Sequence, residues 1–369
     1  MGTIAWLETL SPWPTEFGLD RIRALLARLG DPQLTYPSIH VVGTNGKTGT
    51  ARTAEALLAG EGLTVGTYTS PHATTWAERI RVAGDEVDME EAIGRVRGPA
   101  EALGATQFEV LTAAALAAFA VARVDVAVVE AGLGGRYDAT NVLRSPVQVL
   151  TNVALEHTDV LGDTREAIAA EKLAVVQPGA TVVLGEAAWE PLARELGAAV
   201  VVVVSQSNLA LAHAAVQEFL GRSIGSGAGG AVQVPGRLEH YGEAPLEIRD
   251  GAHNLAGVGY LLGRLPSRRY VIVASILADK DVDGMLAALS VLGDTFVATR
   301  SSNQRALPAR ELADRARARF ARVEVVEEPS HSVARGRELA GAEGALLVTG
   351  SLYLLADLFA ADRSSSLAT

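Results

Sequence analysis

The chain alternates short apolar runs, rich in valine and isoleucine, with longer stretches in which apolar residues recur every three or four positions. Because the short runs are apolar along their whole length, they predict parallel strands that are covered on both faces. In the first part of the chain the predicted strands are residues 38–44, 63–69, 124–132, 147–153, 180–185 and 198–205.

The longer stretches predict amphipathic helices at residues 19–30, 50–62, 89–104 and 164–176. Glycines follow the first two, as they often follow the end of a helix. The most apolar stretch, Leu111–Ala122, is too short to span a membrane and suits a buried helix. Alternating strands and helices predict a doubly wound, mostly parallel α/β domain.

A second α/β pattern follows a change of composition. Glycine, serine and proline dominate residues 221–237, which predicts a linker, and we place the domain boundary between residues 233 and 234. The remaining residues are enough for a smaller α/β domain. Its predicted strands or strand exits are residues 245–254, 269–281, 294–302, 322–329 and 344–355.

Composition narrows the function classes. The net charge of −11 argues against a nucleic-acid-binding protein, which needs a basic stripe. The chain has no cysteine, so disulfides and thiolate metal sites are excluded. No signal-peptide pattern is visible, and we expect a cytoplasmic protein without a membrane partner.

Lysine is rare in this chain, since 29 of its 32 basic residues are arginine. A coding bias explains the rarity but not the places of Lys47, Lys172 and Lys280, which all lie in motif-like segments. Only lysine has an amine that can lose its proton, so we expect at least two of the three to be functional.

Candidate chemistry begins at "HVVGTNGKTGT", where a glycine-rich turn separates a predicted strand from a predicted helix. Gly46, Lys47 and Thr48 match the end of the phosphate-loop pattern G-x-x-x-x-G-K-[ST], but Val41 stands where its first glycine belongs. A strand, a glycine turn and a helix direct N–H groups and the positive helix end toward an anion. The stretch therefore indicates either a nucleotide loop of a different subtype or a capping turn with Asn45 as the cap.

Polar side chains at other strand ends support the nucleotide interpretation. Ser70 follows the strand 63–69, Glu130 ends the next strand along the chain, and His157 comes shortly after the strand 147–153. Open α/β sheets bind ligands at the carboxyl ends of their strands, and phosphoryl transfer needs oxygen ligands for its metal. Single histidines are usually structural, and the "GLGG" after Glu130 is either a plain turn or a weak dinucleotide fingerprint.

The motifs together resemble a known family. "GTNGKT", "TSPH", "VVEAGLGGRYDATN", "EHTDVLGDT", "AEKLAVVQPG", "PGRLE", "DGAHN", "ADKDV" and "TGSLYLL" occur in this order over nearly the whole chain. The sequence is similar to the folylpolyglutamate synthase/dihydrofolate synthase branch of the Mur ligase superfamily, which uses the shortened loop pattern.

The resemblance implies an ATP-dependent amide ligase that joins L-glutamate to a folate or dihydropteroate carboxylate through an acyl phosphate. It implies an ATP-binding domain at 1–233, a C-terminal glutamate-ligase domain at 234–369 and an active site between them; we expect a monomer. The implied nucleotide-binding residues are Gly43, Thr44, Asn45, Gly46, Lys47, Thr48, Gly49, Asn208, Arg237 and Asp250. The implied ligands of two Mg²⁺ sites are Thr48, Ser70, Glu130 and His157. Lys47, Lys172, Asp250 and His253 are the implied catalytic residues, with Lys172 carbamylated.

The chain departs from the family pattern at three places. Thr48-Gly49-Thr50 replaces the usual Gly-Ser after the loop lysine, so we expect Thr48 to ligate the metal, as in the cell-wall ligases. "ATTWAERI" at 73–80 and Glu156 differ near the family's pterin site. Two alternatives follow: a Mur-type ligase for a cell-wall precursor or another acceptor, and a non-catalytic nucleotide-binding regulator.

Overall fold

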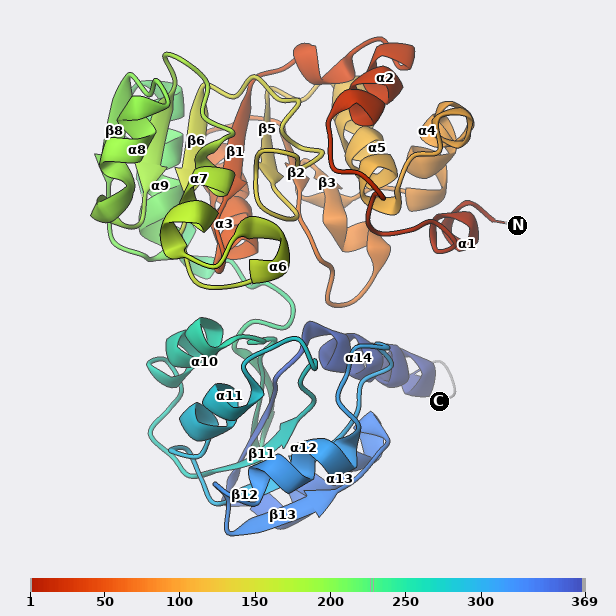
Figure 1. The fold of residues 1–369 in the computed structure, drawn as a ribbon, viewed down its shortest axis with the longest axis vertical. Coiled ribbons are helices and arrows are strands. Elements are labelled where there is room, and N and C mark those ends of the chain that lie inside the picture. Colours follow the sequence, from red (N-terminus) through yellow and green to blue (C-terminus); the bar gives the residue numbers. More distant parts are fainter. Residues whose placement is uncertain (1, 226, 228, 367–369) are drawn as a thin grey trace. The chain divides into compact units, whose positions relative to one another are not determined.

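The computed structural model describes residues 2–225, 227 and 229–366. The chain forms two compact units, one made of Met1–Pro71 with Trp76–Val232 and the other of His72–Thr75 with Gln233–Thr369. Each unit contains its own β-sheet (Figure 1).

The described residues of the first unit form an eight-stranded sheet in the order β4-β3-β2-β5-β1-β6-β7-β8. The strands from β2 to β8 in this order pair in parallel, and the β2–β3 and β3–β4 pairings at one edge are antiparallel. Their bounds are β1 Ser38–Val42, β2 Val65–Tyr68, β3 Ile80–Val82, β4 Asp85–Glu86, β5 Val126–Glu130, β6 Val147–Leu150, β7 Thr181–Leu184 and β8 Val200–Val203.

Helices cover both faces of this sheet because its strands are apolar on both sides. The helices α3 and α9 pack on one face, whereas α2, α4 and α5 together with α7 and α8 pack on the other. The helices are α1 Thr3–Leu7, α2 Asp20–Arg28, α3 Lys47–Gly60, α4 Met89–Leu103, α5 Gln107–Ala122, α6 Thr158–Leu161, α7 Arg165–Leu173, α8 Glu190–Glu195 and α9 Asn208–Leu220. Short 3₁₀ turns are η1 Pro32–Leu34, η2 Trp76–Arg79, η3 Ala187–Trp189 and η4 Gly229–Ala231.

The strand β8 differs from its prediction as a strand covered on both faces. It forms the edge of the sheet, and its Val200 and Val203 are 43% and 40% exposed. This edge strand is apolar although it is not fully covered. An apolar run in the sequence therefore does not distinguish a partly exposed edge strand from a strand buried on both faces.

The alanine-rich stretch Leu111–Ala122 lies in α5, a helix that is buried along most of its length. Thr106 and Glu109 form a capping box at its start, in which each side chain accepts from the other's backbone N–H. Among the described helices, none is long and apolar enough to cross a membrane.

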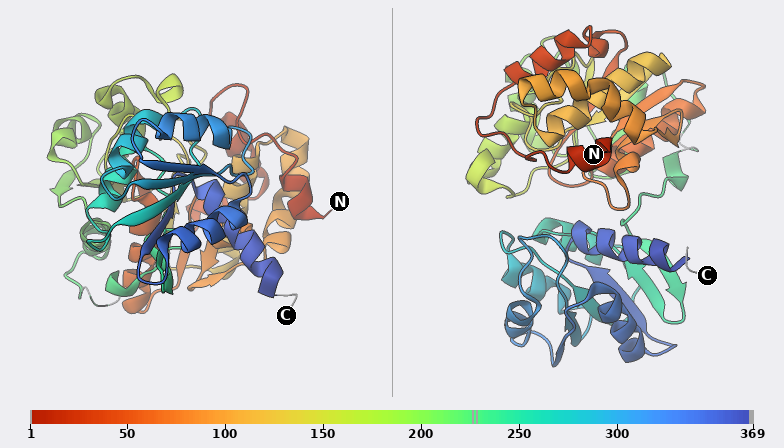
Figure 2. Two further views of the ribbon diagram at one scale, coloured as in Figure 1. Left: turned by 90° about the horizontal axis from the view of Figure 1, so that it is seen from below. Right: turned by 90° about the vertical axis from the view of Figure 1, so that its right-hand side faces the viewer.

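The second unit has a six-stranded sheet in its described residues, in the order β13-β12-β11-β14-β10-β9, with only β9 antiparallel. Helices α10, α11 and α12 cover one face and α13 and α14 the other (Figure 2). The strands are β9 Glu239–Glu243, β10 Leu246–Arg249, β11 Tyr270–Ala274, β12 Thr295–Ala298, β13 Arg322–Val325 and β14 Ala345–Thr349. The helices are α10 Leu255–Leu262, α11 Val282–Leu289, α12 Ala309–Ala316, α13 Pro329–Ala340 and α14 Leu352–Ser366. The predicted fold class is confirmed.

The predicted linker, residues 221–237, is only partly extended chain. Residues 226 and 228 lie outside the described residues. The turn η4 packs against α3, since a Cβ on Gly229 would lie within 3.2 Å of Thr53 and Leu57.

Candidate active site

The loop between β1 and α3 lies at the centre of the first sheet, because β1 pairs with β5 on one side and β6 on the other. Gly46 precedes α3 with a φ of 83°, and no side chain caps the helix. A Cβ on Gly43 would lie 1.9 Å from Thr151 Oγ1, so only glycine fits there. The first N–H groups of α3 are therefore available to an anion.

Two residues after β6 hold the loop. Asn152 accepts from Thr44 N–H through its carbonyl and from Asn45 N–H through its Oδ1. Thr151 Oγ1 donates to the Asn45 carbonyl at 2.7 Å. The alternative of Asn45 as the cap of α3 is wrong, since Gly46 occupies that position.

Lys47 and Lys172 converge on one carbonyl oxygen of the loop. Lys47 Nζ donates to Gly43 O and Thr44 O, both at 3.1 Å. Lys172, in the last turn of α7, donates to Gly43 O at 2.8 Å. The charge of Lys47 and the first N–H groups of α3 make this loop attractive to phosphate.

Lys172 is 4% exposed, and burial together with the charge of Lys47 lowers the pKa of its amine to about 7. Glu156 and Asp138 oppose part of that decrease. A large fraction of Lys172 is therefore a neutral amine near neutral pH, which arginine cannot provide.

Glu130 ends β5, and its carboxylate accepts hydrogen bonds from Thr48 and Ser70, two of the residues predicted to ligate a metal. Thr48 Oγ1 donates to its two carboxylate oxygens at 3.1 and 2.9 Å. The Ser70 N–H donates to Glu130 Oε2 at 3.1 Å. The Ser70 hydroxyl is buried and has no hydrogen-bond partner among the described residues. A carboxylate with two nearby hydroxyls, one of them unsatisfied, fits a hard divalent cation.

His157 immediately precedes α6, at its N-cap position, in a left-handed conformation with a φ of 51°. Its Nε2 lies 3.9 Å from Glu156 Oε1. Within the described part of the chain, no three His, Asp or Glu side chains form a group that could hold a metal by themselves. The structure thus brings Thr48, Ser70 and Glu130 together and places His157 beside Glu156.

Asn208, predicted to contact the nucleotide, lies beside the loop. It is the first residue of α9, the helix that packs most extensively on α3. A Cβ on Gly49 would lie 2.0 Å from Asn208 Nδ2, and one on Gly46 would lie 2.8 Å from Asn208 Oδ1. The carboxamide therefore rests on two loop glycines.

In the second unit, three predicted site residues surround the end of β10. Asp250 accepts from the N–H groups of Leu238 and Ala252 at 2.9 and 2.8 Å. Burial raises the pKa of Asp250, and the charge of Arg237 offsets part of the increase. His253 Nδ1 lies 2.9 Å from Gly251 O. An ordinary turn with local hydrogen bonds would make the same contacts, so the site role of Asp250 and His253 stays a prediction.

Lys280, the third lysine, follows β11 in the second unit. Its side chain is largely buried, and its Nζ lies 3.7 Å from Asp279. The geometry assigns it no role by itself.

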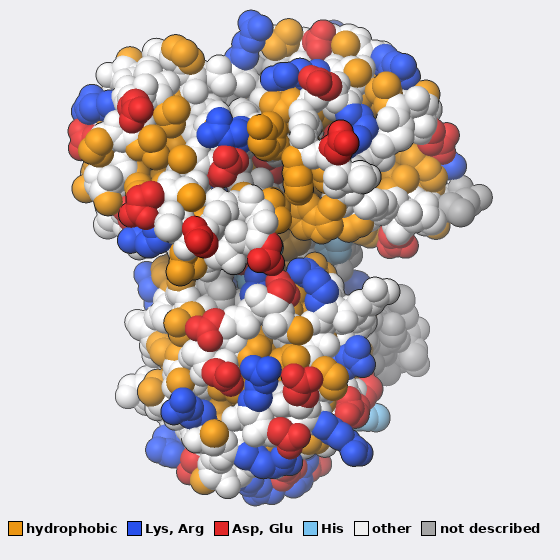
Figure 3. Space-filling model, in the orientation of Figure 1, with side chains coloured by type: hydrophobic (Ala, Val, Ile, Leu, Met, Phe, Trp, Pro, Cys, Tyr) orange, Lys and Arg blue, Asp and Glu red, His pale blue; other side chains and the backbone are white. Residues whose placement is uncertain are grey.

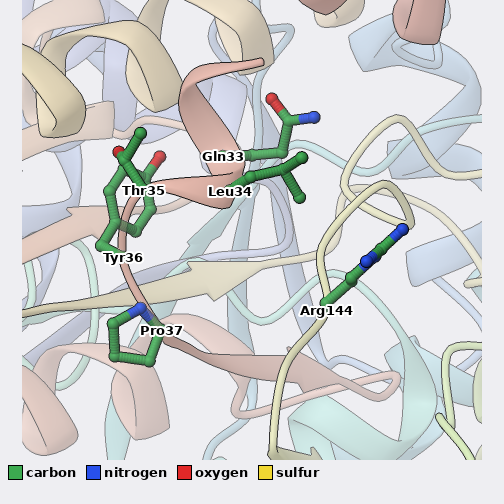
Figure 4. A pocket seen from close by; sticks show the side chains of 6 residues that line it. All are labelled: Gln33, Leu34, Thr35, Tyr36, Pro37 and Arg144. Carbon is green, nitrogen blue, oxygen red and sulfur yellow. The ribbon is translucent and has the colours of Figure 1, made fainter.

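A pocket of about 380 Å³ lies elsewhere in the first unit, lined by Gln33, Leu34, Thr35, Tyr36, Pro37 and Arg144 (Figure 4). Its residues precede β1 and β6, whereas the phosphate loop follows β1. The pocket is therefore at the opposite end of the strands from the candidate chemistry.

Sequence reasoning missed Thr151 and Asn152, which hold the loop, and Asp138, Thr140 and His40, which are hydrogen-bonded to one another in a buried row. Asp138 and Thr140 follow the predicted strand 124–132, and Thr151 and Asn152 are polar residues near the end of the predicted strand 147–153, so their positions were the available signal. His40 lies inside the predicted strand 38–44 and carries no such signal. On the face of each unit seen in Figure 3, acidic and basic side chains are interspersed.

The chain matches two family models, the Mur ligase middle domain at residues 41–220 and the Mur ligase glutamate ligase domain at residues 236–352. The dihydrofolate synthase/folylpolyglutamate synthase of Mycobacterium tuberculosis is 35% identical in an alignment that covers 84% of this chain and 80% of the relative.

Solved structures agree with these matches. E. coli FolC in complex with DHPP and ADP has a TM-score of 0.89 at 29% identity, over 99% of both chains. A bifunctional folylpolyglutamate synthase/dihydrofolate synthase with Mn, AMPPNP and L-glutamate bound has a TM-score of 0.89 at 30% identity, over 98% of both chains. The family predicted from the motifs is thereby confirmed: this chain belongs to the dihydrofolate synthase/folylpolyglutamate synthase family of Mur ligases and is an ATP-dependent ligase.

Proposed function

We propose that this chain joins L-glutamate to the carboxylate of dihydropteroate or a reduced folate, at the expense of ATP and with a divalent metal. The observation that carries the proposal is the pairing, in one unit, of a two-lysine phosphate loop with the Thr48–Ser70–Glu130 cluster. The ligands named for the related structures, ADP, DHPP, AMPPNP, Mn and L-glutamate, support the same substrates.

The reaction requires phosphorylation because a carboxylate is a poor electrophile. The acceptor carboxylate attacks the γ-phosphorus of ATP, which breaks the bond to the β-phosphate oxygen and gives ADP and an acyl phosphate. The glutamate amine then attacks the acyl carbon, loses a proton and expels phosphate. The loop N–H groups and Lys47 bind the phosphates and lower the repulsion between two anionic substrates.

Thr48, Ser70, Glu130 and His157 are the residues that we propose hold Mg²⁺, at two sites. The unsatisfied Ser70 hydroxyl and the Thr48 contact with Glu130 support the first three. Bound there, Mg²⁺ supplies positive charge for the oxygens of the transferred phosphoryl group. Glu130 in turn orients the Thr48 hydroxyl and the Ser70 amide.

Lys172 is proposed to carry a carbamate, formed when its neutral amine adds CO₂ and loses a proton. Its burial and its pKa of about 7 support this role. For the nucleotide we propose contacts from Asn208 in the first unit, and from Arg237, Asp250 and His253 in the second. The proposed domains are residues 1–233 for ATP and 234–369 for glutamate, in a monomer.

The test is a substrate panel with purified protein, Mg-ATP and L-glutamate. We expect phosphate release that depends on both L-glutamate and either dihydropteroate or a reduced folate, with a product heavier by one glutamyl residue in mass spectrometry. UDP-linked muramyl peptides are the comparison acceptors. Equal ATP hydrolysis with and without glutamate and acceptor would show that the proposed function is wrong.

Thr48 provides a second, narrower test. Replacing Thr48 by valine removes the hydroxyl without changing the shape of the side chain, whereas serine keeps the hydroxyl. We expect Thr48→Val to raise the Mg²⁺ concentration for half-maximal rate and lower kcat about 100-fold, the scale of losing one oriented polar group. Thr48→Ser is expected to stay within a few fold of the wild type. If the two variants have the same metal dependence, Thr48 does not ligate the metal.

A further inference from the structure

A buried row of three side chains joins the middle of β1 to the loop after β5. His40 is on β1 and only 1% exposed, and its Nε2 lies 2.8 Å from Thr140 Oγ1. Thr140 Oγ1 in turn donates to Asp138 Oδ1. Thr140 is fully buried and Asp138 nearly so.

The hydrogen bonds along this row all run from donor to acceptor in one direction, from His40 to Asp138. Asp138 also accepts from the N–H groups of Thr140 and Leu133, at 3.0 and 2.8 Å, and from the backbone of Gly132. Burial raises the pKa of Asp138, whereas the hydrogen bonds from Thr140, Leu133 and Gly132 favour its charged form. An ionised carboxylate only accepts, so the single hydroxyl proton of Thr140 points to Asp138. The Thr140 oxygen is then an acceptor, and His40 Nε2 must carry the proton that it receives. Burial lowers the pKa of His40 to about 4, so the ring is neutral with its proton on Nε2.

The loop that this row holds, residues 131–141, lies against the helix end that carries Lys172. A Cβ on Gly135 would lie 2.5 Å from the Lys172 carbonyl and 2.7 Å from that of Glu171. Arg136 donates from its backbone to Glu171 O at 3.0 Å and from its Nε to Glu171 Oε1 at 2.7 Å. The loop therefore packs on the backbone of α7 without room for a side chain.

We propose that His40, Thr140 and Asp138 form a positioning relay that fixes loop 131–141 against α7 and thereby holds the Lys172 amine in its buried place at Gly43 O. The three are positioning residues, since they act on Lys172 through the loop. An effect of the relay on catalysis would depend on the proposed catalytic role of Lys172. The position of the Lys172 amine does not depend on that role.

The scarcity of lysine makes the relay measurable without an activity assay. Protein labelled with ¹³C at lysine Cε has signals from only Lys47, Lys172 and Lys280, and Lys172→Ala identifies the signal of Lys172. In CO₂-free buffer, we expect the Lys172 amine to titrate near 7 in the wild type. In Thr140→Val, which keeps the shape but loses the hydroxyl, we expect its proton affinity to rise at least tenfold, or one pKa unit, as water reaches the amine.

Conservative variants separate positioning from general stability. Thr140→Ser keeps the hydroxyl and is expected to leave the Lys172 titration unchanged. Ser38→Ala is the matched control, because the Ser38 and Ser145 hydroxyls form a buried pair, 2.6 Å apart, at the other end of β1. Urea unfolding of both variants shows whether Thr140→Val and Ser38→Ala lower the free energy of unfolding by similar amounts. If the Lys172 signal titrates alike in Thr140→Val, Ser38→Ala and the wild type, the relay is only structural and the proposal fails.

A second pair of variants serves if Thr140→Val does not fold. His40→Gln keeps an N–H near the place of Nε2, whereas His40→Met removes it. We expect only His40→Met to shift the Lys172 titration, and equal titrations in the two variants would overturn the relay. Steady-state kinetics of the same proteins tests Lys172 separately. A shifted amine with unchanged kcat would leave the relay standing and contradict the catalytic role of Lys172.

Discussion

Replacing Glu130 by glutamine is expected to lower kcat about 1,000-fold, because the protein loses the one carboxylate of the Thr48–Ser70 cluster. Glutamine keeps the shape and one acceptor oxygen, so Thr48 and the Ser70 N–H retain a partner. The charge that favours a divalent cation is lost, and with it several kcal/mol of attraction for Mg²⁺ at the developing phosphoryl charge. The measurement is the steady-state rate at increasing Mg²⁺ or Mn²⁺.

The matched control lies just before the same strand. Asp125 directly precedes β5, five residues before Glu130, and its Oδ2 accepts the N–H of Thr64 much as Glu130 accepts that of Ser70. Asp125→Asn makes the same chemical change at the amino end of the strand, where no ligand is expected. Its rate and metal dependence are expected to match the wild type. A Glu130→Gln enzyme with wild-type metal dependence would remove Glu130 from the metal site.

The strands and helices that the sequence pattern predicted are those with a strong local signal. The parallel strands β1, β2, β5, β6 and β7 were predicted because each is an apolar run that the sheet covers on both faces. By contrast, β4 is the dipeptide Asp85–Glu86 and β9 is the mostly exposed Glu239–Glu243. These strands exist because they pair with a neighbour, and pairing leaves no periodic pattern in so short a segment.

The candidate site was predictable where its residues are adjacent in sequence and only partly elsewhere. The loop from Gly43 to Gly49 is a local pattern, so its spacing suffices. The positions of Ser70 and Glu130 followed from the rule that carboxyl ends of parallel strands meet at one edge. Their contacts depend on the order β2-β5-β1-β6, in which β5 is beside β1 although 83 residues of chain separate them. The order of the strands along the chain does not show which strands are neighbours in the sheet.

The contact of Lys47 and Lys172 with a single carbonyl illustrates the same limit. Lysine scarcity singled out both residues, but their meeting at Gly43 O depends on how α7 packs beside β1. The supporting residues Asn152, Thr140 and His40 were missed for this reason, because each acts on a partner about 100 residues away.

Lys172→Ala is expected to lower kcat about 100-fold, and a small carboxylate such as acetate in the buffer is expected to restore part of the loss. Alanine leaves a space where the proposed carbamate lies, and acetate brings back an anion of similar shape. Lys172→Arg keeps a cation, cannot add CO₂ and leaves no space, so acetate should not rescue it. Wild type and Glu130→Gln with the same acetate are the controls for a general effect on the rate.

The pH dependence follows from the same amine. Because burial and Lys47 lower the pKa of Lys172 to about 7, the amine is protonated below that pH and cannot add CO₂. Wild-type kcat is therefore expected to fall as the pH decreases through about 7, and acetate-rescued Lys172→Ala should lack that step. Protein equilibrated with ¹³CO₂ should show a carbamate carbon signal that Lys172→Ala lacks. Full activity of Lys172→Ala without acetate would contradict the carbamate and any catalytic need for a charge at this position. Low activity of Lys172→Ala together with full activity of Lys172→Arg would instead make Lys172 a second cation for the phosphates.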